Sequence, residues 1–154
     1  MLAICLSHAA QADTLYGRVV GIADGDTLTI LDANREQHRI RLAGIDAPER
    51  KQPFGQASKQ SLSDLAYDRD VDVEWRKTDR YGRIIGKVLV SGQDANLIQI
   101  KKGMAWHYKK YESEQPVADR KVYAAAENRA RQQRQGLWRE QLPITPWDWR
   151  KGSR

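Results

Sequence analysis

The order of its extended and helical segments is the feature that most restricts the fold of this chain. Segments rich in β-branched residues, each closed by Gly, Asp or Asn, predict short strands. The strands are expected at 15–22, 27–31, 38–45, 71–75 and 84–90, and helices at 53–68, 96–102 and 119–135. Five short strands with a helix after the third favour an α+β fold built on a five-stranded OB-type Greek-key barrel. An open α+β sheet is the alternative that this pattern leaves.

The chain divides into a leader, one domain and a tail. Its 154 residues fit a single domain. Residues 1–12 are similar to a signal peptide that is short at its amino-terminal end, because an apolar stretch is followed by Ala10-Gln11-Ala12 and then Asp13. The domain would then span 13–140, followed by a basic tail at 141–154. We therefore expect a secreted or periplasmic protein.

The tail contains prolines and tryptophans. Pro143 and Pro146 are expected to keep it non-helical, because proline lacks the backbone N–H that a helix interior needs. We expect Trp138, Trp147 and Trp149 to pack the tail onto the domain, since buried tryptophan usually serves packing.

Positive charge is concentrated late in the chain. The net charge is +6, but residues 1–100 hold 13 basic and 14 acidic residues, whereas residues 101–154 hold 13 basic and 6 acidic ones. A basic surface attracts polyanions, of which nucleic acid is the commonest. No apolar run approaches the roughly 20 residues of a membrane-spanning helix, so a spanning role is excluded.

Four carboxylates lie at two predicted chain reversals. Asp24 and Asp26 flank Gly25 after the first strand, and Asp46 and Glu49 follow the third strand. If these two strand ends are neighbours, the acids converge, and converging carboxylates repel one another unless a cation joins them. An all-oxygen ligand set favours Ca²⁺ or Mg²⁺ over zinc. Taken alone, the Asp-Gly-Asp sequence is also typical of a plain turn.

Two arginines stand out beside these acids. Arg41 lies between Ile40 and Leu42 in the third strand, so its guanidinium is expected to be partly enclosed and to need an anionic partner. That partner is either a structural carboxylate or a bound anion. Arg83 follows Gly82, which lets the backbone approach a ligand but is equally typical of a hairpin turn.

Three motifs taken together resemble the staphylococcal nuclease family. They are D-G-D-T at 24–27, R-L-A-G-I-D-A-P-E at 41–49 and D-R-Y-G-R at 79–83, and G-L-W at 136–138 is similar to the usual family ending. The resemblance runs from about residue 16 to residue 138 and implies an OB-type barrel with supporting helices, in agreement with the strand pattern.

The resemblance implies a calcium-dependent phosphodiesterase that acts on DNA and RNA and leaves 3′-phosphate ends. By position, the catalytic residues would be Arg41, Glu49 and Arg83, with Glu49 as general base and the two arginines stabilising the transition state. The Ca²⁺ ligands would be Asp26, Asp46 and the backbone carbonyl of Ala47. Ala47 departs from the best-known member, which has Thr there; a carbonyl ligand survives that change, and a hydroxyl contact does not.

The resemblance also implies substrate contacts. Arg80 and Tyr81 match the positions that hold a terminal phosphate, and Tyr108 and Tyr111 are candidates for nucleotide contacts although they align poorly. We expect a monomer that prefers single-stranded substrate and needs no membrane or protein partner. The alternatives are a non-catalytic nucleic-acid-binding OB module and a module whose basic surface binds acidic protein or lipid.

Overall fold

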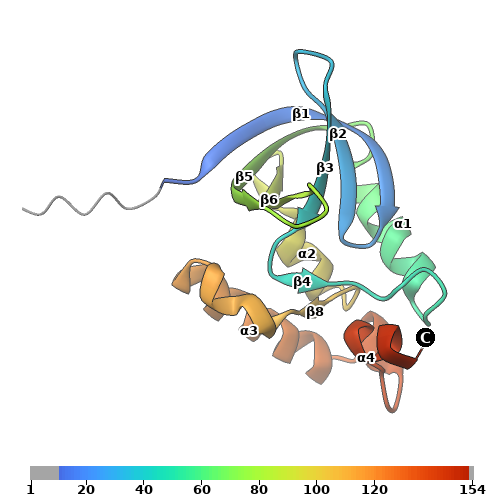
Figure 1. The fold of residues 1–154 in the computed structure, drawn as a ribbon. Coiled ribbons are helices and arrows are strands. Elements are labelled where there is room, and N and C mark those ends of the chain that lie inside the picture. The colour runs from blue at the N-terminus through green and yellow to red at the C-terminus, as the bar shows by residue number, and fades with distance from the viewer. Residues whose placement is uncertain (1–10, 153–154) are drawn as a thin grey trace, which may run out of the picture.

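A computed structural model describes residues 11–152, and its centre is a closed barrel (Figure 1). The barrel strands are β1 (Asp13–Asp24), β2 (Thr27–Leu31), β3 (Gln37–Leu42), β5 (Asp70–Thr78) and β6 (Ile84–Val90). They are hydrogen-bonded in the order β3-β2-β1-β5-β6, and a parallel pairing of β3 with β6 closes the ring. This closure excludes the open sheet and confirms the predicted α+β barrel.

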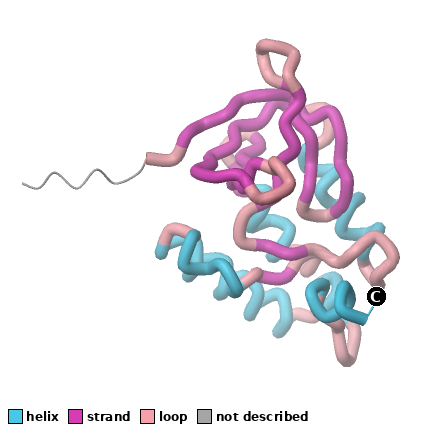
Figure 2. The backbone as a smooth tube through the Cα atoms, in the orientation of Figure 1, coloured by secondary structure: helices cyan, strands magenta, loops and turns pink. Residues whose placement is uncertain are grey.

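Helices surround one end of the barrel, as Figure 2 shows. They are α1 (Gly55–Ala66), α2 (Ala95–Lys101), α3 (Val117–Gln132) and α4 (Pro146–Gly152), with short 3₁₀ turns η1 (Lys109–Glu114) and η2 (Gly136–Arg139). The short strand β7 (Gln93–Asp94) precedes α2. No helix among residues 11–152 is long and apolar enough to cross a bilayer.

Alternation along the strands builds the core. In β3, Ile40 and Leu42 are buried whereas Arg39 is exposed, as the period of two predicts. The main apolar core joins the barrel interior to α1, α2 and α3, and its fully buried members include Leu28, Ile30, Ile40, Leu62, Val73, Val88 and Ile100.

The predicted third strand is interrupted. Residues 38–45 were expected to run unbroken, but β3 ends at Leu42, and β4 (Ile45–Asp46) forms a second small sheet with β8 (Trp106–His107). Gly44 lies between them with a φ of 75°, a left-handed conformation that suits glycine. The break turns the segment that carries Asp46 and Glu49 away from the barrel toward the helical layer.

The tail corrects another expectation. Pro146 does not prevent a helix but begins α4, because proline is tolerated in the first helical turn, where no intrahelical bond is needed from its nitrogen. Trp138 and Trp106 lie edge to face with centroids 4.4 Å apart, and Trp147 packs edge-on against Trp106 at 5.7 Å. The tail is thus anchored by tryptophan, as predicted for Trp138 and Trp147.

The leader lies almost wholly outside the described residues. The described chain begins just before β1, which starts at Asp13, the first residue after the predicted cleavage point. The signal peptide therefore stays a prediction.

Candidate active site

Helices α1 and α2 pack against the turn between β1 and β2 and fix its position. The side-chain amide of Gln99 in α2 donates to the carbonyls of Gly25, at 2.8 Å, and Ser58, at 3.0 Å. A Cβ atom on Gly25 would lie 1.8 Å from Ser58 Oγ, so only glycine fits between the two aspartates of this turn. This packing directs Asp26, which is 5% exposed, toward the end of β3.

Arg41 joins the acids of the two turns. Its Nη1 lies 3.4 Å from Asp26 Oδ2 and its Nη2 lies 3.2 Å from Asp46 Oδ1. Nη1 also donates to the carbonyls of Leu42, at 3.0 Å, and Ile45, at 2.9 Å. The backbone N–H of Ala47 donates to Asp26 Oδ2 at 2.6 Å. The structure therefore brings the two acidic turns together, as expected if their strand ends are neighbours, and Arg41 lies between Asp26 and Asp46.

The energetics of this acid cluster favour a positive partner. Burial, followed by the nearby charge of Asp26, raises the pKa of Asp24 to about 7. Burial also raises the pKa of Asp46, although Arg150 and Arg41 oppose that shift. Enclosed carboxylates of this kind are costly to ionise unless cationic groups face them.

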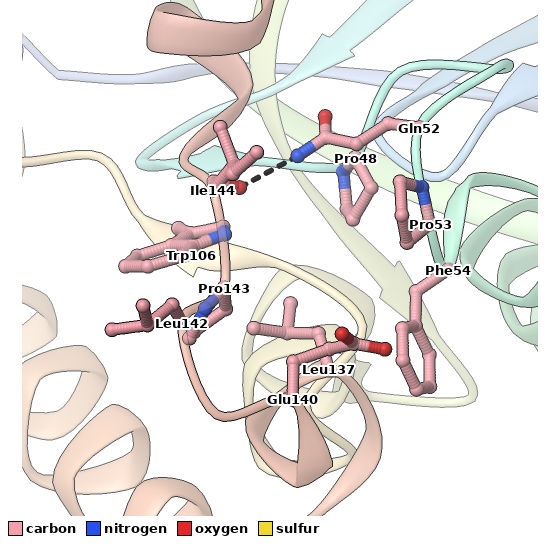
Figure 3. Close-up of a pocket in the computed structure, with 10 residues that line it drawn as sticks. All are labelled: Pro48, Gln52, Pro53, Phe54, Trp106, Leu137, Glu140, Leu142, Pro143 and Ile144. Carbon is pink, nitrogen blue, oxygen red and sulfur yellow. Dashed lines mark hydrogen bonds between the residues drawn. The ribbon is translucent and has the colours of Figure 1, made fainter.

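Glu49 lies at the exposed edge of the cluster. Its side chain is 37% exposed, and its backbone N–H donates to Gln52 Oε1 at 3.0 Å. A Cβ atom on Gly55 would lie 2.0 Å from the carbonyl oxygen of Glu49, so the start of α1 packs directly on this turn. Gln52, which is buried, also donates to the carbonyl of Ile144 at 2.6 Å, and Figure 3 shows this bond between the Glu49 turn and the tail.

Arg150 of α4 also contacts the acids, although no sequence motif includes it. Its Nη1 donates to Glu49 Oε1 at 2.7 Å and to Asp46 Oδ1 at 3.2 Å, and its Nη2 donates to Asp46 Oδ2 at 2.8 Å. Hydrogen bonds from Arg150 to Asp46, and then to Glu49, raise the pKa of Arg150 against the opposing effect of burial. More than 100 residues separate Arg150 from these acids, so no local spacing signal marks it.

Arg83 lies on the loop that leads into β6, the strand paired with β3. Ile85, two residues further along the chain, is the register partner of Arg41. Arg83 Nε donates to Asp79 Oδ2 at 2.7 Å, and this bond lowers the pKa of Asp79 although burial opposes the shift. Within residues 11–152, no hydrogen bond or ion pair joins Arg83 to Arg41 or Glu49.

The other predicted substrate residues form two groups. Arg80 Nη2 donates to the hydroxyl of Tyr81 at 2.6 Å, and the Tyr81 ring is 66% exposed on the loop before β6. Tyr108 lies after β8, with its ring centroid 5.7 Å from Tyr111 and 5.4 Å from Trp147. A main-chain bond of 2.9 Å from Tyr108 to Gly44 ties this second group to the acid cluster.

An open groove of about 400 Å³ lies beside Tyr108. Its walls combine aromatic and basic side chains: Trp106, His107, Tyr108, Lys109, Lys110, Glu127, Arg131, Trp147 and Lys151. The buried Glu127 accepts from the backbone N–H of His107 at 2.6 Å and from Arg131 at 3.1 Å, so its charge is compensated. The groove therefore presents positive charge and aromatic faces to solvent.

A second acidic group lies away from these residues. Asp32, Glu36 and His38, at the β2–β3 hairpin, are close enough to share a cation. Asp32 is already used locally, because it accepts from the backbone N–H groups of Asn34 and Glu36 and from His38. This arrangement is explained by turn formation.

Comparison with known proteins identifies the family. A family model described as staphylococcal nuclease homologue matches residues 39–140. The chain belongs to the staphylococcal nuclease family. An uncharacterized endonuclease of Haemophilus influenzae is 45% identical over 134 residues, covering 87% of this chain and 72% of that protein. A micrococcal nuclease of Shigella flexneri is 41% identical over 160 residues, covering 98% and 88%.

Family membership confirms the resemblance seen in the three sequence motifs. The chain is a hydrolase of the nuclease class, with the OB-like barrel and supporting helices of its family. The matched span includes Arg41, Glu49 and Arg83, whereas Asp26 lies before it and Arg150 after it.

Proposed function

We propose that this nuclease hydrolyses phosphodiester bonds of DNA and RNA in a calcium-dependent reaction at the Asp26–Arg41–Asp46–Glu49 cluster. The observation that carries the proposal is the position of Glu49, a solvent-accessible carboxylate at the edge of a buried acid pair and within reach of guanidinium groups. Metal-assisted hydrolysis requires a general base, buried acids that can hold a cation, and guanidinium donors that bind phosphate.

The donor chemistry of the cluster fits a calcium ion. Asp26 and Asp46 would supply carboxylate oxygens and Ala47 would supply a backbone carbonyl, which are the hard ligands that Ca²⁺ prefers. The enclosed acids already attract positive charge, as their contacts with Arg41 show. Bound there, Ca²⁺ supplies charge neutralisation and orientation for a phosphate.

Glu49 would act as the general base. It accepts a proton from a water molecule as the water oxygen bonds to phosphorus, and the 5′-oxygen of the next nucleotide leaves with a proton from solvent, giving a 3′-phosphate and a 5′-hydroxyl. General-base assistance of this kind contributes about 10²–10⁴ in rate. Gln52 accepts from the backbone N–H of Glu49 and so fixes the turn that carries this carboxylate.

Arg83 and Arg41 would stabilise the charge that develops on the phosphate. Among the described residues, the Arg83 guanidinium is hydrogen-bonded through Nε to Asp79, which leaves its terminal nitrogens for two phosphate oxygens. Arg41 is bonded to carbonyls and carboxylates, so it would mainly hold the acids in place. Its positive charge would also stabilise the negative charge on the phosphate. Well-placed donors of this kind contribute roughly 3–4 kcal/mol each to transition-state stabilisation.

The aromatic and basic groove favours single-stranded substrate. Unpaired bases stack on aromatic faces, and the Tyr108–Trp147 wall offers such faces beside Lys109 and Lys110. Arg80 and Tyr81 would bind a terminal phosphate, since both are on the exposed loop that carries Arg83.

A digestion assay tests the proposal. Purified protein should cleave labelled single-stranded DNA with Ca²⁺ and stop on addition of EGTA, and Glu49→Gln and Arg83→Lys should each lose at least 10²-fold in rate. The matched control Arg39→Lys alters an exposed arginine of β3 and should retain activity. Binding of DNA without cleavage by the wild-type protein would instead identify the non-catalytic module. Activity that survives EGTA would remove calcium from the reaction.

We also propose that the protein is exported. The first described strand begins at Asp13, so removal of residues 1–12 would leave every described strand and helix intact. Amino-terminal sequencing of the protein from periplasm or medium should begin at residue 13, and an uncleaved cytoplasmic product would contradict export.

A further inference from the structure

The guanidinium of Arg150 covers both oxygens of the Asp46 carboxylate. Nη2 lies 2.8 Å from Oδ2 and Nη1 lies 3.2 Å from Oδ1, in the two-pronged geometry that matches an arginine to a carboxylate. Arg41 lies 3.2 Å from the same Oδ1. Two guanidinium groups therefore share an acid whose side chain is 2% exposed.

Arg150 also binds Glu49, the proposed base. Its Nη1 lies 2.7 Å from Glu49 Oε1, which is the shortest of its three contacts. A carboxylate held in this way has one oxygen turned to the guanidinium instead of to a water molecule. One arginine thus occupies a proposed metal ligand and the proposed base together.

The helix that carries Arg150 is docked on the domain by several contacts. Pro146 is buried, and the Trp147 ring packs against Trp106 and Tyr108. Thr145 Oγ1 accepts from the backbone N–H of Asp148 at 3.2 Å and thereby caps the first turn. The Arg150 side chain, which is 43% exposed, can therefore leave the acids by rotation about its own bonds while α4 stays in place.

We propose that Arg150 substitutes for the divalent cation in the metal-free protein, and that the cation and Arg150 compete for Asp46. This inference rests on the proposed calcium site. A cation bound to Asp46 would lie against an oxygen that Arg150 already contacts, and two positive charges at that distance repel, so the guanidinium withdraws when the cation binds. The same withdrawal releases Glu49, so cation binding also frees the base.

Calorimetric Ca²⁺ titration of the intact chain tests this competition without measuring activity. Arg150→Gln removes the competing guanidinium and should lower the Kd for Ca²⁺ about tenfold, equivalent to about 1.4 kcal/mol of binding free energy. Arg150→Lys retains the charge but cannot span both acids, and its Kd should lie between those of the wild type and Arg150→Gln.

Arg139→Gln is the matched control. It removes the same charge from an exposed residue of η2 that makes no ion pair within the described part of the chain. Its Ca²⁺ Kd should remain within about twofold of the wild type, since an exposed charge that pairs with no acid of the described site is screened by solvent. Circular dichroism should show that all variants are folded.

The outcomes separate this inference from the proposed function. If the wild type and Arg150→Gln bind Ca²⁺ equally well, or the variant binds more weakly, Arg150 does not compete and the inference is wrong, although the calcium site stands. If Arg139→Gln tightens binding as much as Arg150→Gln does, net charge explains the effect and the inference is also wrong. If no variant binds Ca²⁺, the proposed calcium site itself fails.

Discussion

Replacing Arg41 should expose how strongly the acid cluster depends on its central cation. Arg41→Met keeps similar side-chain length but removes the guanidinium that bonds Asp46 at 3.2 Å and lies 3.4 Å from Asp26. The side chains of these two acids are 2% and 8% exposed, so water cannot replace the lost partner. The carbonyls of Leu42 and Ile45 lose a donor as well.

The magnitude follows from the partners that remain. Removing one partner of a buried ion pair costs about 3–5 kcal/mol. Arg150 still grips Asp46 and the Ala47 N–H still donates to Asp26, so we expect the lower end, about 3 kcal/mol. For a chain of this size, that loss corresponds to a fall in Tm of about 6–12 °C.

The assay is urea unfolding in EDTA, followed by tryptophan fluorescence. Arg39→Met is the matched control, because Arg39 is exposed on the same strand, and its free energy of unfolding should change by less than about 0.5 kcal/mol. Adding Asp26→Asn to Arg41→Met removes the carboxylate that loses its guanidinium partner and should recover part of the loss. An Arg41→Met protein within about 1 kcal/mol of wild type would refute the reasoning.

Three further substitutions test other parts of the fold. Asn96→Ala removes a fully buried amide that bonds three backbone groups of the barrel, and should cost about 3–5 kcal/mol in urea unfolding; a loss under 1 kcal/mol would contradict this. Gly25→Ala places a methyl group against Ser58 and should cost about 1–3 kcal/mol, with an unchanged Tm contradicting the clash. A hydrogen bond from His38 lowers the pKa of Asp32, so ionised Asp32 stabilises the folded chain above its unfolded pKa of about 4. Asp32→Asn should therefore lower Tm at pH 7, and the difference should vanish as pH falls through the lowered pKa; a Tm difference independent of pH would argue against it.

Much of the candidate site was predictable because its residues are close in sequence. Arg41, Asp46 and Glu49 lie in one nine-residue segment, and the alternation of β3 already directed Arg41 away from the core. The Asp26 turn was predictable as a neighbour once a barrel was assumed. The position of Arg83 relative to this group stays a prediction, because its side chain is bonded to Asp79 and not to the cluster.

Two predictions, the length of the third strand and the absence of a helix in the tail, were wrong because tertiary packing outweighed local sequence preferences. The third strand was predicted to reach Ile45, but pairing of β4 with β8 gives residues 45 and 46 a different partner. Pro146 was expected to exclude a helix, yet the contact of Trp147 with Trp106 stabilises the short α4 that Pro146 begins. Helices of seven residues are unstable alone, so docking decides whether they form.

The sequence by itself determined the barrel, its family and the acid and arginine motifs, because strand periodicity, turn residues and short spacings are local properties of a chain. Only the tertiary structure decided which distant groups complete the cluster. Gln99 reaches Gly25 across 74 positions and Arg150 reaches Asp46 across 104, and contacts at such separations depend on how helices dock, which no local pattern encodes.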